Sequence, residues 1–145
     1  MAIDIRHVGR RYGPFQRTVC ADQIEAFAIA VAGGVPGHFG SAQGDPHPFS
    51  TTVAPPTFGV TFAMSPFALA CTDPELGLDL LRLLHAEQEF EHGAVVRAGD
   101  LLTTVGEIVD VRSRGLLDFL TVRTDTVNQG GERVLVARWT AVIRG

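Results

Sequence analysis

The sequence has few cysteines and no excess of positive charge. Its 12 basic residues are outnumbered by 16 acidic ones, for a formal net charge of −4 and a pI near 5.7. This balance argues against a nucleic-acid partner, because neutralising phosphates requires a basic face. Cys20 and Cys71 form no CxxC motif, so they are interpreted as structural thiols in a reducing, cytoplasmic setting. The opening segment, MAIDIRHVGRR, lacks the apolar run of a secretory signal.

Charge is missing from one long internal segment. Residues 46–72 contain no Asp, Glu, Lys or Arg, which could suggest a membrane span. Prolines argue against a span, because each removes a hydrogen-bond donor and interrupts a helix; they are Pro46, Pro48, Pro55, Pro56 and Pro66. The sequence therefore predicts no membrane partner and a segment buried inside protein.

The overall composition is that of one globular domain. Hydrophobic residues make up 46% of the 145 residues and charged residues 19%, which is ordinary for a folded chain. No repeat, linker or low-complexity stretch divides the sequence. Residues 1–145 are therefore expected to form a single domain.

Three helices are predicted. The first covers 21–32, where Ile24, Phe27, Ala28 and Val31 have helical spacing. The second covers 57–64, is apolar on nearly every side, and ends at Ser65 because Pro66 follows; it should be almost fully buried. The third opens at 72–75, whose sequence Thr-Asp-Pro-Glu has the form of a capping box, and continues through the leucines that follow. These leucines are Leu76, Leu80, Leu81 and Leu84.

Strands are predicted after His85, over 101–112, 116–127 and 133–143. The sequence Asn-Gln-Gly-Gly at 128–131 indicates a hairpin, and Gly99-Asp100 indicates a tight turn that opens a strand. Helices early and long strands late favour an α+β fold with a bent antiparallel sheet wrapped around the buried helix.

Five segments in this order resemble the MaoC-like dehydratase/hydratase group of the hot-dog fold, in particular its N-terminal, non-catalytic-type domain. The segments are IEAFA at 24–28, APPTF at 54–58, HAEQEF at 85–90, RAGD at 97–100 and VNQGGE at 127–132. The resemblance implies reversible addition of water to a 2-enoyl thioester on coenzyme A or acyl-carrier protein, without a cofactor. It also implies pairing with a second hot-dog subunit, identical or different.

Active members of that family carry an Asp and a His in a Gly-Asp-x-Asn-Pro-x-His loop after the first helix. Here residues 32–38 place His38 at the histidine position, but Gly33 stands where the Asp belongs. A competing register over 44–50 retains Gly44-Asp45 and puts Ser50 at the histidine position. Glycine cannot remove a proton from water, so neither register supplies the complete acid/base pair.

Three functions remain open. The chain is interpreted first as a binding and structural subunit, with catalysis on a partner and with Pro56, Thr57, Phe58, Glu87 and Gln88 as substrate-binding candidates. Alternatively, it is an active homodimeric hydratase in which His38 works with Asp45 or His47, or a non-enzymatic acyl-CoA-binding protein. A thioesterase of this fold would need a carboxylate on the central helix, and residues 57–69 contain none.

Two further groups have a functional and a structural interpretation. His85, Glu87 and His92 could ligate a metal, since a strand puts residues 85 and 87 on one face. Their spacing does not repeat, so a polar helix-to-strand junction is favoured and no metal site is predicted. Arg10, Arg11 and Arg17 could meet coenzyme A phosphates but are interpreted as solvated surface.

Overall fold

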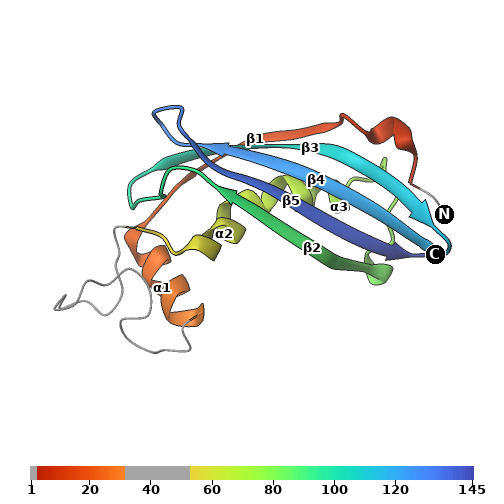
Figure 1. The fold of residues 1–145 in the computed structure, drawn as a ribbon, viewed down its shortest axis with the longest axis horizontal. Coiled ribbons are helices and arrows are strands. Elements are labelled where there is room, and N and C mark those ends of the chain that lie inside the picture. Colours follow the sequence, from red (N-terminus) through yellow and green to blue (C-terminus); the bar gives the residue numbers. More distant parts are fainter. Residues whose placement is uncertain (1–2, 32–52) are drawn as a thin grey trace.

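A computed structural model describes residues 3–31 and 53–145, and it contains one five-stranded antiparallel sheet (Figure 1). The strand order is β1-β3-β4-β5-β2. The strands are β1 (Arg11–Thr18), β2 (Leu83–His92), β3 (Leu101–Arg114), β4 (Leu117–Val127) and β5 (Arg133–Arg144). The predicted α+β class and antiparallel sheet are confirmed. Strand β1 was not predicted, because Gly13-Pro14 interrupts its pattern and the strand pairing shifts between Tyr12 and Phe15.

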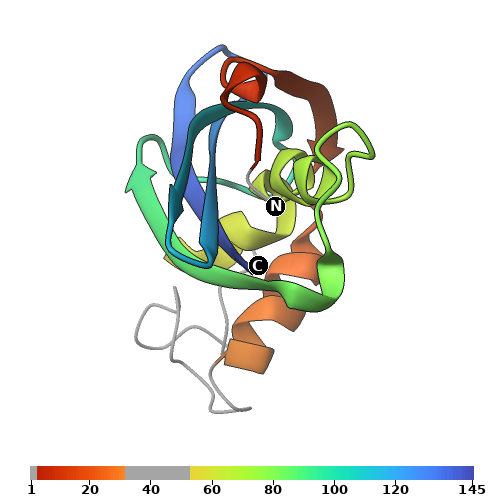
Figure 2. The same ribbon diagram turned by 90° about the vertical axis from the view of Figure 1, so that its right-hand side faces the viewer.

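The helical elements are η1 (Ile5–His7), α1 (Ala21–Val31), η2 (Pro56–Gly59), α2 (Val60–Ala63), α3 (Ser65–Cys71) and η3 (Leu80–Arg82). Of these, α2 and α3 lie on the inner face of the bent sheet (Figure 2). The successive elements η2, α2 and α3 form the central helical segment that the sheet wraps. None of the helices in the described ranges is long and apolar enough to cross a membrane.

The central helical segment differs from its prediction in length and burial. It continues past Ser65, because Pro66 lies in the first turn of α3, where a missing N–H is tolerated. Phe58, Phe62 and Phe67 are buried, whereas residues 57, 64, 68 and 69 are exposed. The sheet wraps the central helix as predicted, but within residues 57–64 burial is incomplete, because the two end residues, 57 and 64, are exposed.

The helix predicted from residue 72 does not form. The Asp73 carboxylate accepts the Glu75 N–H at 3.0 Å, and Gly77 then has a φ of 61°, which ends the turn. The short η3 follows, and β2 begins at Leu83. The polar cluster around Glu87 thus lies within a strand and not at a helix-to-strand junction.

Both predicted turns are confirmed. The Asn128 side chain accepts hydrogen bonds from the N–H groups of Gly130 and Glu132, each at 3.0 Å, and Gly131 has a φ of 77°. Before β3, Gly99 has a φ of 91°, and the Asp100 carboxylate accepts the Arg97 N–H at 2.8 Å. Each turn satisfies its own backbone donors, which is why local sequence was sufficient to predict it.

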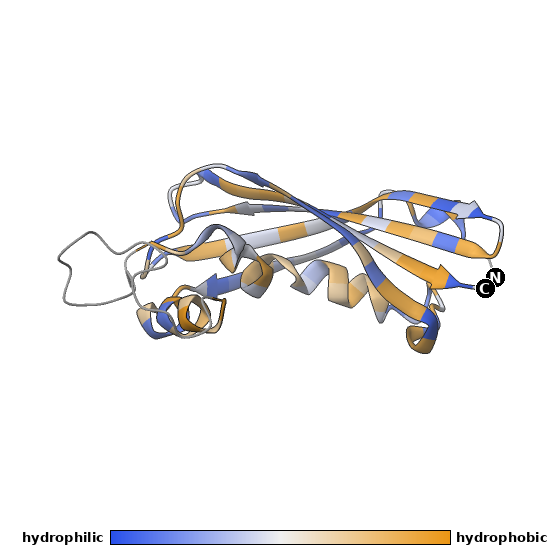
Figure 3. Ribbon diagram, turned by 60° about the horizontal axis from the view of Figure 1, so that its bottom comes forward, coloured by the Kyte–Doolittle hydropathy of each residue, from blue (hydrophilic) through white to orange (hydrophobic). Residues whose placement is uncertain are grey.

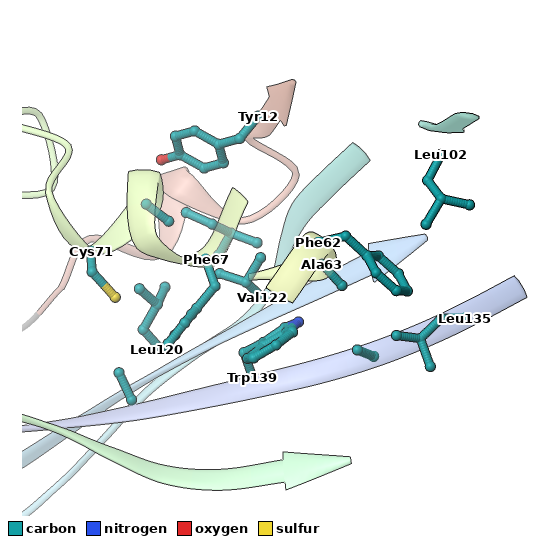
Figure 4. Close-up of a cluster of buried hydrophobic side chains, with 14 of the residues drawn as sticks. Tyr12, Phe62, Ala63, Phe67, Cys71, Leu102, Leu120, Val122, Leu135 and Trp139 are labelled. Carbon is teal, nitrogen blue, oxygen red and sulfur yellow. The ribbon is translucent and has the colours of Figure 1, made fainter. Parts of the chain in front are cut away.

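The core lies between the sheet and the central helical segment (Figure 4). Trp139, Ile108 and Leu120 are fully buried there. The Trp139 indole donates a 2.9 Å hydrogen bond to the Thr124 hydroxyl, so its polar atom is satisfied inside the core. Hydrophobic and hydrophilic residues alternate along the strands, as expected for a sheet with one buried face (Figure 3).

Candidate functional site

An apolar cavity of about 310 Å³ lies where the central helical segment begins. Its walls come from η2 and α2, from the end of β2 with the residues that follow it, and from β5. The lining residues are Ala54, Pro55, Pro56, Phe58, Gly59, Phe62, His92, Gly93, Ala94, Val95, Val96, Val134 and Leu135. Among these described residues His92 is the only one with an ionisable side chain, so the cavity suits an apolar group.

Backbone hydrogen bonds fix the walls of the cavity. The Ala54 N–H donates to the Val96 carbonyl at 2.8 Å, and the Ala94 N–H donates to the Arg133 carbonyl at 3.0 Å. A Cβ atom added at Gly59 would lie 2.6 Å from Leu135 Cδ2. Glycine at position 59 therefore lets the helix approach β5 without displacing the lining.

Aromatic contacts join α1 to the same wall. The rings of Phe27 and Phe58 meet edge to face with centroids 5.5 Å apart, and Phe58 lies 6.1 Å from Phe62. The Thr61 hydroxyl donates to the Phe58 carbonyl at 2.8 Å, and the Arg17 guanidinium donates to the Thr61 carbonyl. Arg17 thus holds the helical segment in place.

The other two N-terminal arginines also have protein partners. Arg10 forms ion pairs with Asp73 and Glu75, and Arg11 lies 3.4 Å from Glu107. These contacts give each arginine a role within the fold and leave the suggested contact with coenzyme A phosphates without support from the geometry.

The substrate-binding candidates are divided between two hollows. Pro56 and Phe58 line the apolar cavity, whereas Thr57 is exposed and does not. Glu87 and Gln88 line a separate polar groove of about 600 Å³ beside Arg138 on the outer face of the sheet. The catalytic candidates His38, Asp45 and His47 lie outside the described residues.

Sequence reasoning missed several lining residues, including Gly59, Ala94, Val96 and Leu135. Residues 93–96, Gly-Ala-Val-Val, follow the polar cluster as a short apolar run, and that change of character was the available signal. Leu135 had no such signal, because β5 comes beside this run only through its pairing with β2.

Strand β2 forms an edge of the sheet and is largely exposed. It pairs with β5 on one side, and no strand among residues 3–31 and 53–145 pairs with its other side. The edge leaves a row of backbone donors and acceptors available to another strand. In a protein of this size such an edge is a ready interface.

A shift in the pairing separates His85 from Glu87. His85 opposes Ala141 and Glu87 opposes Thr140, with an irregularity between them. The His85 ring lies on the inner face, 5.3 Å from that of Phe67, while Glu87 lies on the outer face with Thr140. The expectation that residues 85 and 87 share a face was wrong, and the described ranges contain no cluster of three or more metal-ligating side chains.

Comparison with known proteins identifies the family. The sequence model of the FAS1-like dehydratase domain region matches residues 6–137. The chain belongs to this family. It is also 37% identical to a UPF0336 protein from Saccharopolyspora erythraea, over 100% of this chain and 94% of that protein.

Solved structures give the same assignment. A C-terminally truncated HadBC (3R-hydroxyacyl-ACP dehydratase) complex from Mycobacterium tuberculosis is 25% identical, with a TM-score of 0.70 over 98% of this chain and 99% of that one. A MaoC-like dehydratase is 28% identical, with a TM-score of 0.77, over 95% of this chain and 42% of that one. The predicted MaoC-like hot-dog assignment is confirmed.

Proposed function

We propose that this chain is a cytoplasmic binding subunit of an acyl-thioester hydratase or dehydratase, acting on a 2-enoyl group carried by coenzyme A or acyl-carrier protein. It holds the acyl chain in the apolar cavity, while a second hot-dog chain supplies the catalytic acid/base pair. The observation that carries the proposal is the character of the cavity: apolar walls with His92 as the one ionisable side chain among the described lining residues.

The size and lining of the cavity fit an acyl chain. A volume of about 310 Å³ lies at the lower end of the range of small-molecule sites, about 300–1,000 Å³, which suits a short chain. Each methylene buried against Phe58, Phe62 and Leu135 would contribute about 0.8 kcal/mol. Binding would therefore depend on hydrocarbon contact more than on polar recognition.

The described lining of this cavity is poorly equipped for hydration itself. Water addition needs one group to remove a proton from water and another to protonate the α-carbon. His92 could serve in one of these roles only, and the sequence has Gly33 where the family places its aspartate. The missing half of the pair is therefore assigned to a partner.

The free edge of β2 supports a partner of the same fold. Pairing through this edge would extend the sheet and satisfy its exposed backbone groups. A stable interface of this kind should bury at least about 1,000 Å² in total. The similarity to the HadBC (3R-hydroxyacyl-ACP dehydratase) complex agrees with such an arrangement.

The test follows loss of the conjugated-thioester absorbance of a short 2-enoyl-CoA. The purified chain alone should show very weak hydration or none, because losing one member of an acid/base pair costs about 10²–10⁴ in rate. Adding a hot-dog chain with an intact Gly-Asp-x-Asn-Pro-x-His loop should produce activity. Robust activity of the chain alone that falls in both His38→Ala and Asp45→Ala would overturn the proposal in favour of an active homodimer.

A further inference from the structure

The outer side of the free β2 edge carries a row of negative charge. Glu87, Glu89 and Glu91 occupy consecutive outward positions, and all are exposed. Their neighbours on β5 are Thr140, Arg138 and Val136, so one arginine faces the row. In the part of the chain that the structure describes, none of these glutamates forms an ion pair.

This row has a consequence for pairing between identical chains. In an antiparallel pair, directly opposed residues lie on the same face of the sheet. A two-fold pairing of β2 with its own copy, centred anywhere in residues 87–91, must therefore place a glutamate opposite a glutamate. When the axis passes through Glu89, Glu87 also opposes the copy's residue 91, so every carboxylate in the row faces another.

Like charges directly opposite on paired strands are destabilising, and the row cannot be avoided by a small slip in register. A slip of one residue would turn the inward-facing Phe90 outward, and that ring packs against the core 5.8 Å from Trp139. A slip of two residues that keeps the axis within residues 87–91 again places a glutamate opposite a glutamate. The β2 edge can therefore pair with another strand, but charge repulsion disfavours its pairing with a copy of itself.

We infer that β2 selects a different hot-dog chain, one whose edge strand carries Lys or Arg at outward-facing positions. This inference rests on the edge pairing in the proposed function and specifies the partner by charge. Opposite charges across the junction would stabilise the heteromeric pair and speed its formation. The polar groove beside the edge contains charges of both signs, because Asp110, Arg112 and Arg138 line it with Glu87 and Glu89.

The first experiment removes the charge from the row. The variant Glu87→Gln/Glu89→Gln/Glu91→Gln should self-associate at least about tenfold more tightly than wild type in sedimentation at neutral pH and low salt. The matched control, Asp22→Asn/Glu107→Gln/Asp125→Asn, makes the same change in net charge on α1 and on interior strands β3 and β4, away from the β2 edge. The control should leave self-association unchanged.

The second experiment supplies a surrogate partner. The variant Glu87→Lys/Glu89→Lys/Glu91→Lys, whose fold is checked by circular dichroism, is mixed with the wild-type chain. The mixture should form a one-to-one complex that weakens with salt, whereas each protein alone should remain monomeric at micromolar concentration. The natural chain contains no lysine. Carbodiimide coupling of wild-type carboxylates to the introduced amines should therefore yield amide cross-links between the two β2 strands.

Two results would overturn the inference. One is a wild-type homodimer whose β2 backbone amides are protected from hydrogen exchange and whose dissociation constant does not change in the Gln variant. The other is a Gln variant that stays monomeric together with no complex in the Lys mixture. Neither result depends on hydratase activity. Activity of the isolated chain would end the proposed function, whereas a stable β2 homodimer without activity would end only the inference about charge.

Discussion

The Tyr12 hydroxyl donates a 2.8 Å hydrogen bond to the carboxylate of Asp73, joining β1 to the turn that follows α3. Arg10 Nε lies 2.9 Å from the same oxygen of Asp73, and the other oxygen accepts the Glu75 N–H at 3.0 Å. The Asp73 side chain is 8% exposed. This buried carboxylate therefore connects the N-terminal strand to the end of the central helical segment.

Asp73→Asn should destabilise the protein by about 1–3 kcal/mol, the cost of weakening charge-assisted hydrogen bonds to a buried group. Urea unfolding would measure the loss. The control is Asp79→Asn, because Asp79 caps η3 in a similar way but its side chain is 50% exposed. Equal losses in the two variants would contradict the role assigned to the contact with Tyr12.

The contribution of Asp73 should also depend on pH. Burial opposes ionisation, but the hydrogen bonds from Tyr12 and the Glu75 N–H, with the nearby Arg10 charge, outweigh it and lower the pKa of Asp73. A lowered pKa means that the folded state favours the charged form. The contribution is therefore complete above the unfolded pKa of about 3.9 and is lost as pH falls through the lower folded value. The stability difference between wild type and Asp73→Asn should shrink below pH 4; a constant difference from pH 7 to pH 2 would contradict this.

Tyr12 and Asp73 also show why the helix predicted from residue 72 was wrong. The capping-box pattern at 72–75 is local, but the partner of Asp73 lies 61 positions away on a strand that was not predicted. The long strands were predictable because residues 101–112 alternate in part and residues 116–127 and 133–143 are rich in Val, Leu, Thr and Phe, a composition that favours strands. Only part of the cavity could be predicted from the sequence. Pro56 and Phe58 lie in the APPTF segment that resembles the family, whereas Leu135 reaches the cavity only through the pairing of β5 with β2.

Gly106→Ala should destabilise the fold by about 1–3 kcal/mol through overpacking. A Cβ atom at Gly106 of β3 would lie 2.2 Å from Pro66 Cβ, so the glycine lets the central helical segment lie directly on the sheet. The matched control is Gly130→Ala, since a Cβ there would meet nothing closer than 3.4 Å. Thermal unfolding of both variants measures the difference. Since Gly→Ala lowers the entropy of the unfolded chain and should not by itself destabilise the fold, a loss in the control as large as in Gly106→Ala would contradict overpacking as the cause.

The two thiols should react at very different rates. Cys20 is exposed, while Cys71 is buried in α3, and burial raises the pKa of Cys71 to about 11. Since the thiolate is the reactive form, a thiol reagent at pH 7.5 should modify Cys20 rapidly in the native protein and Cys71 only after denaturation. The Cys20→Ser variant should then show almost no fast labelling; fast labelling of that variant would mean that the core opens at α3.

Ala94→Phe should shorten the acyl chain that the protein can bind. Ala94 is half-buried in the cavity wall, and a phenyl ring added there would occupy much of the volume between Phe62 and Leu135. For wild type, titration calorimetry with a series of saturated acyl-CoA thioesters should show affinity rising about fourfold per methylene until the cavity is full.

In Ala94→Phe this increase should stop at a shorter chain, while binding of coenzyme A alone should not change, because the substitution removes space only for hydrocarbon. Ala26→Phe provides the control, since Ala26 is exposed on α1 and does not line the cavity. An affinity that is independent of chain length in wild type would show that the cavity does not hold the acyl group. Equal effects of the two substitutions would place the binding site elsewhere.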